Sequence, residues 1–234
     1  IMKNELHNRP LVIDLDNTLV SIDTLFEATV SFIKKRILNF FLIIKWILKG
    51  KLYFKNKLIK FEKIEPEKIP YNSKVISLLK ESKSSGKEII LCSGAHEVQV
   101  KLIADYLDIF DNYYGSDRNI NLTGKNKAEF LENKYGKGNF DYVGDSHKDL
   151  PVWISCNTAY SVNLKKKTKA ILINSINQKQ KYIEILGRKS LLDQLKIFLR
   201  TIRAHQWIKN ILLFIPLFLS QIYSLNSIIS VIIA

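Results

Sequence analysis

The sequence predicts an α/β protein whose parallel, doubly wound sheet carries a polar site at one edge. Runs of branched apolar residues, each of strand length, alternate along the chain with stretches of helical periodicity. This alternation favours right-handed βαβ crossovers and therefore a parallel sheet. Three of the apolar runs also end in polar residues, and open α/β sheets place their sites at the carboxyl ends of strands. Fold and site position are thus predicted by the same pattern.

The stretch from Leu11 to Val20 is the segment around which the rest of the chain is organised. A run of branched apolar residues leads into Asp14 and Asp16, two carboxylates spaced two residues apart, and then into Thr18. Carboxylates at a buried strand end are unfavourable unless they are neutralised, and Mg²⁺ does this with oxygen ligands. A carboxylate beside such a cation can also attack phosphorus, because aspartyl-phosphate formation is an established covalent strategy.

Four further strands are predicted, separated by helical stretches. They are Glu88 to Ser93, Tyr113 to Gly115, Phe140 to Asp145, and Thr158 to Val162. Two of them end in polar residues, Ser93 with Gly94 and Asp145, which we expect at the same sheet edge as Asp14 and Asp16. The α/β part is expected to close at Asn163.

A basic and aromatic segment from about Ile22 to Pro70 separates the first two strands. Ten Lys or Arg and a single acid, Glu62, lie between Lys34 and Lys63, and the whole chain has a net charge of +14. The uncharged part of this basic segment, 37–44, is too short to span a bilayer. We therefore expect a basic helix that lies at an anionic membrane surface. The alternative is a helical insertion that packs on its own domain. Nucleic-acid binding is not expected, because the aromatic residues lie among bulky aliphatics.

The C-terminal part has a different composition. A basic connector with an amphipathic helix is expected over 165–209, and residues 210–234 carry no charge and could span a bilayer. The Lys and Arg excess before this segment predicts a membrane protein whose α/β domain is cytoplasmic. Because the chain starts on Ile1 and stops at Ala234 inside an apolar run, it looks like a fragment of a longer product. Cys92 and Cys156 show no disulfide or metal-like spacing, which favours a reducing compartment.

Four short motifs occur in a fixed order that resembles the haloacid dehalogenase-like (HAD) phosphohydrolases over residues 10–163. They are Asp14-Leu15-Asp16-Asn17-Thr18, Ser93, a lysine, and Gly144-Asp145-Ser146-His147-Lys148-Asp149. The resemblance implies a Rossmann-like fold, a small helical cap at about 22–70, and Mg²⁺ as cofactor.

The same resemblance implies roles for individual residues. Asp14 would be the nucleophile and Asp16 the general acid/base. Ser93, Gly94 and a lysine would bind the phosphoryl group. The metal would be held by Asp14, Asp16, Asp145 and Asp149. Lys127 is favoured as the motif lysine because it heads the run Lys127-Ala128-Glu129-Phe130-Leu131, and Lys125 is the alternative.

A second resemblance lies at the C-terminal edge. Arg203-Ala204-His205-Gln206-Trp207-Ile208-Lys209-Asn210 and the apolar run after it look like the opening of a UbiA-family membrane prenyltransferase, in particular the decaprenyl-phosphate phosphoribosyltransferase-like branch. The aspartate-rich motifs of that family lie in later helices and are not in this sequence. The chain therefore cannot carry out prenyl transfer by itself.

Together these observations predict three parts: a HAD-like phosphatase domain at 1–164, a connector at 165–209, and a first transmembrane helix at 210–234. The expected substrate is a phosphorylated small molecule or a lipid-linked phosphomonoester of polyprenyl-phosphate metabolism. Two alternatives are a membrane-anchored phosphatase without a transferase, and a non-catalytic HAD scaffold of the prenyltransferase.

Overall fold

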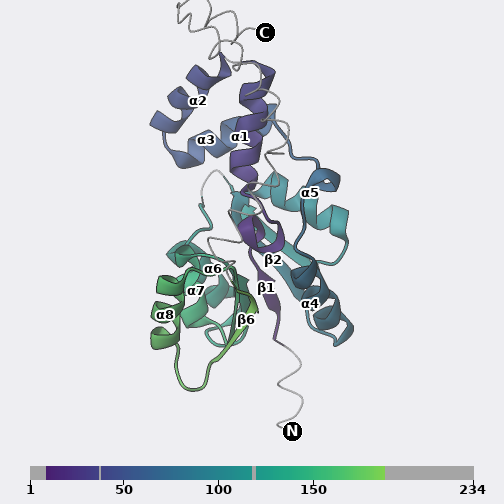
Figure 1. The fold of residues 1–234 in the computed structure, drawn as a ribbon, viewed down its shortest axis with the longest axis vertical. Coiled ribbons are helices and arrows are strands. Elements are labelled where there is room, and N and C mark those ends of the chain that lie inside the picture. Colours follow the sequence, from purple (N-terminus) through teal and green to yellow (C-terminus); the bar gives the residue numbers. More distant parts are fainter. Residues whose placement is uncertain (1–8, 37, 118–119, 188–234) are drawn as a thin grey trace, which may run out of the picture. The chain divides into compact units, whose positions relative to one another are not determined.

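A computed structural model of the chain describes residues 9–36, 38–117 and 120–187, which belong to one compact unit. Its centre is a six-stranded parallel sheet with the order β3-β2-β1-β4-β5-β6 (Figure 1). The strands are β1 Leu11–Ile13, β2 Ile89–His96, β3 Asn112–Ser116, β4 Asp141–Gly144, β5 Thr158–Val162 and β6 Lys181–Leu186. The predicted parallel α/β sheet is confirmed.

The strand order reverses beside β1, which pairs with β2 on one side and β4 on the other. The chain runs outward from β1 through β2 to β3, and then crosses back to β4. In open α/β sheets such a reversal leaves a crevice outside the carboxyl ends of the strands. The residues at the carboxyl ends of β1, β2 and β4 therefore lie close together at this edge of the sheet.

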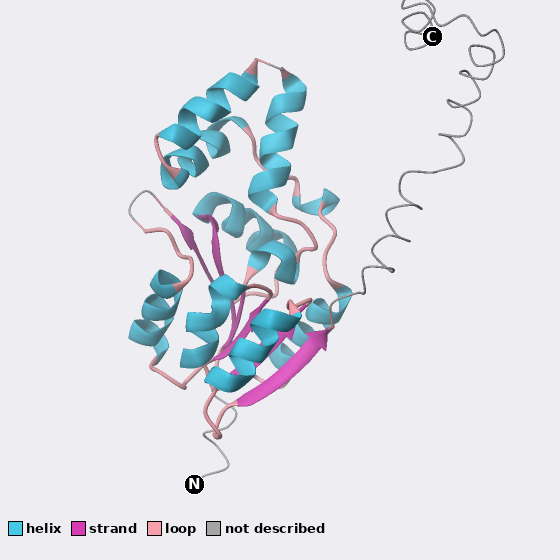
Figure 2. Cartoon of the chain, turned by 60° about the vertical axis from the view of Figure 1, so that its left-hand side comes forward, coloured by secondary structure: helices cyan, strands magenta, loops and turns pink. Residues whose placement is uncertain are grey.

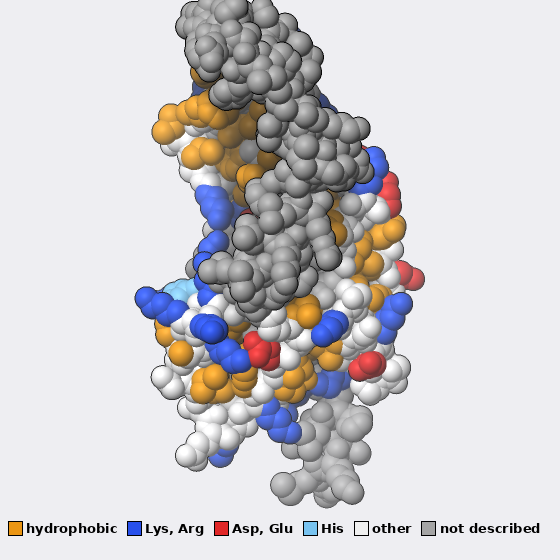
Figure 3. Space-filling view, viewed as in Figure 1, with side chains coloured by type: hydrophobic (Ala, Val, Ile, Leu, Met, Phe, Trp, Pro, Cys, Tyr) orange, Lys and Arg blue, Asp and Glu red, His pale blue; other side chains and the backbone are white. Residues whose placement is uncertain are grey.

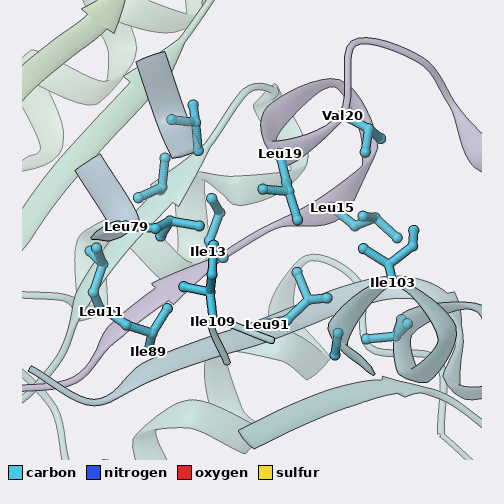
Figure 4. Packing of buried hydrophobic residues seen from close by; sticks show 14 of the residues in the cluster. Leu11, Ile13, Leu15, Leu19, Val20, Leu79, Ile89, Leu91, Ile103 and Ile109 are labelled. Atoms are coloured by element: carbon cyan, nitrogen blue, oxygen red, sulfur yellow. The ribbon is translucent and has the colours of Figure 1, made fainter. Parts of the chain in front are cut away.

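Helices cover both faces of the sheet. On one face, α4 (Ser73–Ser84) and α5 (Glu97–Leu107) pack against Leu11, Ile13 and their neighbours, as Figure 4 shows. The other face is covered by the helices α6 Lys125–Tyr135, α7 Leu150–Ser155 and α8 Lys166–Ser175, which meet residues such as Val12. Successive strand residues point to opposite faces, so a strand covered on both faces is apolar throughout, as β1 is.

The segment between β1 and α4 forms a separate helical cap at one end of the sheet (Figures 1 and 2). Its helices are α1 Thr24–Lys35, α2 Asn39–Leu48 and α3 Lys51–Phe61. The predicted helical insertion is thus confirmed. Its small core is rich in aromatic residues: Trp46 stacks on Phe32 at a centroid distance of 5.4 Å, and the exposed ring of Phe61 lies 5.6 Å from each of them. An antiparallel bridge between Val20 and Tyr71 closes its base.

The sheet extends beyond the end expected at residue 164. Lys166–Ser175 forms α8, and Lys181–Leu186 pairs in parallel with β5 as β6. The sequence Lys165-Lys166-Lys167-Thr168-Lys169 looked like a connector because its lysines are solvent-facing, although Leu172 is fully buried. β6 was missed because it is an edge strand with exposed residues, which weakens the apolar pattern.

Of the described helices, none is long and apolar enough to cross a membrane. The expected amphipathic helix at 189–203, the prenyltransferase-like motif at 203–210 and the expected span at 210–234 lie outside the described residues.

Candidate functional site

The polar residues predicted at three strand ends line one pocket. Asp14 follows β1, Ser93 lies in β2, and Asp145 follows β4; Lys127, from the first turn of α6, completes this end of the pocket. The cavity holds about 140 Å³, and residues of the cap form its opposite wall. A cavity of this size fits a compact phosphorylated group, because pockets for larger ligands hold about 300 Å³ or more.

A buried chain of hydrogen bonds fixes the nucleophile candidate. The Lys127 ammonium donates to Asp14 Oδ1 at 2.8 Å and to the Tyr142 hydroxyl at 2.9 Å, and that hydroxyl donates to Asp149 Oδ1 at 2.7 Å. Burial lowers the pKa of Lys127, but the adjacent Asp14 and Asp149 carboxylates outweigh this effect and raise it. Lys127 is therefore a permanent cation in the site.

The structure distinguishes the two candidate lysines. Lys127 is buried and lines the pocket, whereas Lys125, the first residue of α6, is exposed and lies outside the pocket. The geometry therefore supports Lys127 as the phosphoryl-binding lysine. The position of Lys125 directly after Gly124 predicts a loop residue, but Lys125 begins the helix.

Asp14, Asp145 and Asp149 form a carboxylate cluster in which one oxygen from each residue lies within 4.8 Å of the others. Burial, followed by repulsion from Asp149 and Asp14, raises the pKa of Asp145 to about 8. Burial also raises the pKa of Asp14, against the attraction of Lys127. Burial therefore disfavours the charged form of both carboxylates, a cost that a bound cation would offset, and three hard oxygen donors suit Mg²⁺.

Asp149 also has a positioning role. Its Oδ2 accepts the backbone N–H groups of Asp145 and Ser146 at 3.3 and 3.1 Å, which closes a capping box with Ser146. These bonds hold the loop that carries Asp145 against the end of β4. Asp149 is buried, and these bonds supply the partners that a buried carboxylate oxygen needs.

The Asp16 carboxylate does not join this cluster. Its Oδ1 accepts both the backbone N–H and the hydroxyl of Thr24, at 2.8 and 2.7 Å, which turns it toward the start of α1. The expectation that its carboxylate ligates the metal is therefore not supported by the geometry. Burial raises the pKa of Asp16, and the two bonds from Thr24 oppose that rise. Asp16 lines the pocket as a carboxyl that can carry a proton, as a general acid must.

Ser93 and Gly94 lie side by side at the end of β2. Both line the pocket, and the Gly94 carbonyl accepts from the Ser116 hydroxyl at 2.8 Å. A Cβ at Gly94 would lie 2.4 Å from Thr123 Cγ2, so a side chain at this position of β2 would require Thr123 to move. The expected phosphate-binding residues Ser93, Gly94 and Lys127 are thus brought together.

Several pocket residues were not found from the sequence. Thr24 and Tyr142 lie just behind the pocket and hold the Asp16 and Asp149 carboxylates, while Lys51, Lys55 and Lys148 line the pocket themselves. Only the lysine at position 148 could have been suspected, because it lies within the last motif. The others reach the site through tertiary contacts alone.

Comparison with known proteins bears on the fold of the chain. No family model matches the chain. It is 29% identical over 219 residues to y4nM, an uncharacterised protein of Sinorhizobium fredii, and this match covers 91% of the chain but only 40% of y4nM. The chain therefore spans less than half the length of this curated relative.

Solved structures share the fold at low sequence identity. A HAD family hydrolase from Salmonella enterica serovar Typhi has a TM-score of 0.54 at 14% identity, covering 70% of this chain and 65% of that one. A substrate-bound phosphoserine phosphatase has a TM-score of 0.51 at 18% identity, covering 81% and 98%. The chain thus has the fold of the HAD-family phosphatases, and it carries an acidic cluster of Asp14, Asp145 and Asp149 at the carboxyl edge of its sheet.

Proposed function

We propose that this chain is a Mg²⁺-dependent phosphatase that hydrolyses a phosphomonoester through an aspartyl-phosphate. The observation that carries the proposal is the buried contact of Lys127 with Asp14, inside a cluster of three carboxylates at the carboxyl ends of β1 and β4. This arrangement places a nucleophile, a cation and metal-type ligands within one small pocket. A non-catalytic scaffold would not need a buried lysine paired with the first carboxylate.

The chemistry follows from where each group lies. An oxygen of Asp14 attacks phosphorus, the bond between phosphorus and the ester oxygen breaks, and Asp16 gives its proton to the leaving oxygen. Asp16 then takes a proton from a water molecule, which attacks the aspartyl-phosphate and releases inorganic phosphate. Ser93 and Lys127 stabilise the charge on the equatorial oxygens, which dominates this type of transition state.

The metal would be held by Asp14, Asp145 and Asp149. When bound, Mg²⁺ supplies Lewis-acid charge that lets a carboxylate and a phosphate of like charge approach each other. The raised pKa values of Asp14 and Asp145 support such a role, because burial and the neighbouring carboxylates disfavour their charged forms and a bound cation would offset this cost.

The partner surface that we propose for the cap is an anionic membrane. α2 exposes a continuous apolar face that includes Phe40, Phe41 and Leu48, and Figure 3 shows hydrophobic side chains gathered over this helix. Lys45 and Lys49 lie on the same helix or directly after it. Exposed aromatic residues beside lysines are typical of helices that bind anionic bilayers, because the two groups contact acyl chains and headgroups respectively.

We also propose that the domain is the cytoplasmic part of a longer membrane protein with a UbiA-type prenyltransferase, acting on a lipid-linked phosphate. The proposal is supported by Arg203–Asn210 and the uncharged residues after it, and y4nM extends far beyond the matched region. A membrane-anchored phosphatase without a transferase is the alternative. Hydrophobic spans with an aspartate-rich motif in the continuing gene product would favour the fusion, and a stop soon after Ala234 would favour the anchor.

The activity is tested with the chain and a generic aryl phosphate in the presence of Mg²⁺. We expect hydrolysis by the wild type, and none by Asp14→Asn, which keeps the size of the side chain but removes the nucleophilic oxygen charge. Equal turnover by the variant would refute Asp14 as nucleophile. Acid quenching should also trap phosphate on the protein in the wild type only.

A further inference from the structure

The pocket has a second, basic end formed by the cap. Its walls there are Lys51 and Lys55 of α3, together with Lys148 from the loop after β4. In Figure 3, Lys and Arg side chains line the hollow between cap and sheet. None of these three lysines takes part in the phosphoryl transfer proposed above, so their gathering at one cavity requires another explanation.

Lys55 fixes the position of α3 over the site. It is buried, and its ammonium donates to the Gly94 carbonyl and to Asn121 Oδ1, the latter at 2.9 Å. The next residue, Asn56, contacts His96 Nε2 at 2.9 Å through its side-chain oxygen. The cap is therefore attached to the end of β2, directly beside the phosphate-binding residues.

Lys51 lies one helical turn before Lys55 and faces the same pocket. In the described part of the chain, neither Lys51 nor Lys148 has a carboxylate partner in an ion pair, whereas Lys127 is paired with Asp14. The cap end thus holds two unpaired cations beside a third, buried one. Burial, and after it the charge of Lys51, lower the pKa of Lys55 to about 8.

One carboxylate, Asp23, also lines this part of the pocket. Its Oδ1 accepts the backbone N–H of Phe26 at 3.0 Å, so it caps the start of α1. The Asp23 carboxylate, like that of Asp16, attracts Lys55, but among the described residues it forms no ion pair with Lys51 or Lys148.

We infer that the substrate carries a second anionic group, a carboxylate or a phosphate, which Lys51 and Lys148 bind while the ester phosphate lies at Asp14. The inference rests on the proposed phosphatase function, since it defines the substrate class of the same pocket. Ammonium groups are compact cations that suit either anion. A neutral group at this place would leave the two lysines unpaired, so the pocket discriminates against monoesters without the second charge.

Binding is measured by calorimetry on Asp14→Asn with Mg²⁺, so that no turnover is needed. The probes are phosphoglycerate and glycerol bisphosphate, which carry a second anionic group. Glycerol monophosphate, which lacks a second anionic group, is the reference, and all three are phosphorylated on a terminal carbon. We expect the two probes with a second anionic group to bind at least about tenfold more tightly than glycerol monophosphate, since charge-assisted hydrogen bonds are stronger than neutral ones. A preference for only one of them identifies carboxylate or phosphate as the preferred anion.

The double substitution Lys51→Met and Lys148→Met should remove this preference, and Lys51→Arg with Lys148→Arg should keep most of it. Lys60→Met is the matched control, because Lys60 is an exposed lysine on the same helix outside this pocket. Equal binding of all probes to the parent protein, or a preference that survives the double Met variant, overturns the inference. Selective binding without hydrolysis of the preferred probe by the wild type would refute the phosphatase proposal and leave the anion site standing; hydrolysis of the probes without selectivity would do the reverse.

Discussion

The buried Lys127 holds together the carboxylates of the candidate site. Its ammonium contacts Asp14 at 2.8 Å and reaches Asp149 both directly, at 3.6 Å, and through the Tyr142 hydroxyl. It therefore neutralises part of the carboxylate cluster and orients the nucleophile at the same time. Removal of such a cation leaves buried charges without a partner, which is more costly than the loss of a surface ion pair.

Substitution of Lys127 by Met should lower kcat/KM for an aryl phosphate by about a hundredfold or more, the cost of removing one group that stabilises developing charge. Lys125→Met, two residues earlier on the same helix, should retain wild-type activity because Lys125 is exposed and lies outside the pocket. Steady-state kinetics with a thermal melt of each variant provides the measurement. The reverse result would make Lys125 the phosphoryl-binding lysine.

The raised pKa of Asp145 predicts a pH dependence in the metal-free protein. Between its usual value of 3.8 and about 8, the folded chain holds a proton at Asp145 that the unfolded chain has lost. Since stability falls with pH wherever the native state binds more protons, the free energy of unfolding in EDTA should decrease as the pH rises from about 6 to about 8.

Mg²⁺ competes with that same proton, so its affinity should increase over this pH range. Calorimetric titrations at several pH values test this, with Asp145→Asn as the control that loses the dependence. An affinity for Mg²⁺ that does not change with pH would show that Asp145 is already ionised in the metal-free protein.

At the scale of elements, the cap is a small helical unit with its own core. Phe32, Trp46 and Leu58 belong to this core, which is separate from the two cores on the faces of the sheet. α3 contributes to the core with one face and to the pocket with another, through Lys51 and Lys55. Damage to the cap core should therefore affect the substrate pocket as well.

Leu58→Ala should destabilise the protein by about 2–5 kcal/mol, because it removes a fully buried side chain and leaves a cavity. Leu48→Ala, on the neighbouring helix, is the matched control, since Leu48 is 82% exposed and its loss should change stability by less than about 0.5 kcal/mol. Urea unfolding followed by tryptophan fluorescence measures both variants. An equally small decrease in the free energy of unfolding for both variants would indicate that the cap core does not contribute to stability.

At the scale of the whole molecule, the described unit presents two surfaces of different character. The pocket between cap and sheet is polar and carries both carboxylates and lysines, whereas the outer face of α2 is apolar. If α2 lies on a membrane, the pocket and the bilayer are kept close together, which suits a substrate with a lipid part.

Replacing Phe40 and Phe41 by Ser should reduce binding to anionic vesicles in a flotation assay, since both side chains are exposed on α2. Phe26→Ser removes a similarly exposed aromatic residue from α1 and should leave vesicle binding in place. The residues 189–234 could themselves bind lipid, so the comparison is made between variants of the same chain. Equal flotation of all three proteins would refute a membrane contact through α2.

The sequence alone determined the parallel sheet and the strand ends that carry Asp14, Ser93 and Asp145. Both features follow from local sequence patterns, because an apolar run indicates a buried strand and the polar residue directly after it indicates where that strand ends. The existence and position of the cap were also readable, because Pro66 and Pro70 interrupt a helical pattern inserted between two strands.

Only the tertiary structure decided which side chains meet in the site. Thr24 holds Asp16 away from the carboxylate cluster, Tyr142 connects Lys127 to Asp149, and Lys55 reaches Gly94 from the cap. Each contact joins segments that approach only when the chain crosses the sheet or the cap folds back over it. The same reason explains β6, whose exposed residues become a strand only by pairing with β5. Periodicity reports which face of an element is buried, whereas the partner across a pocket depends on packing between distant elements.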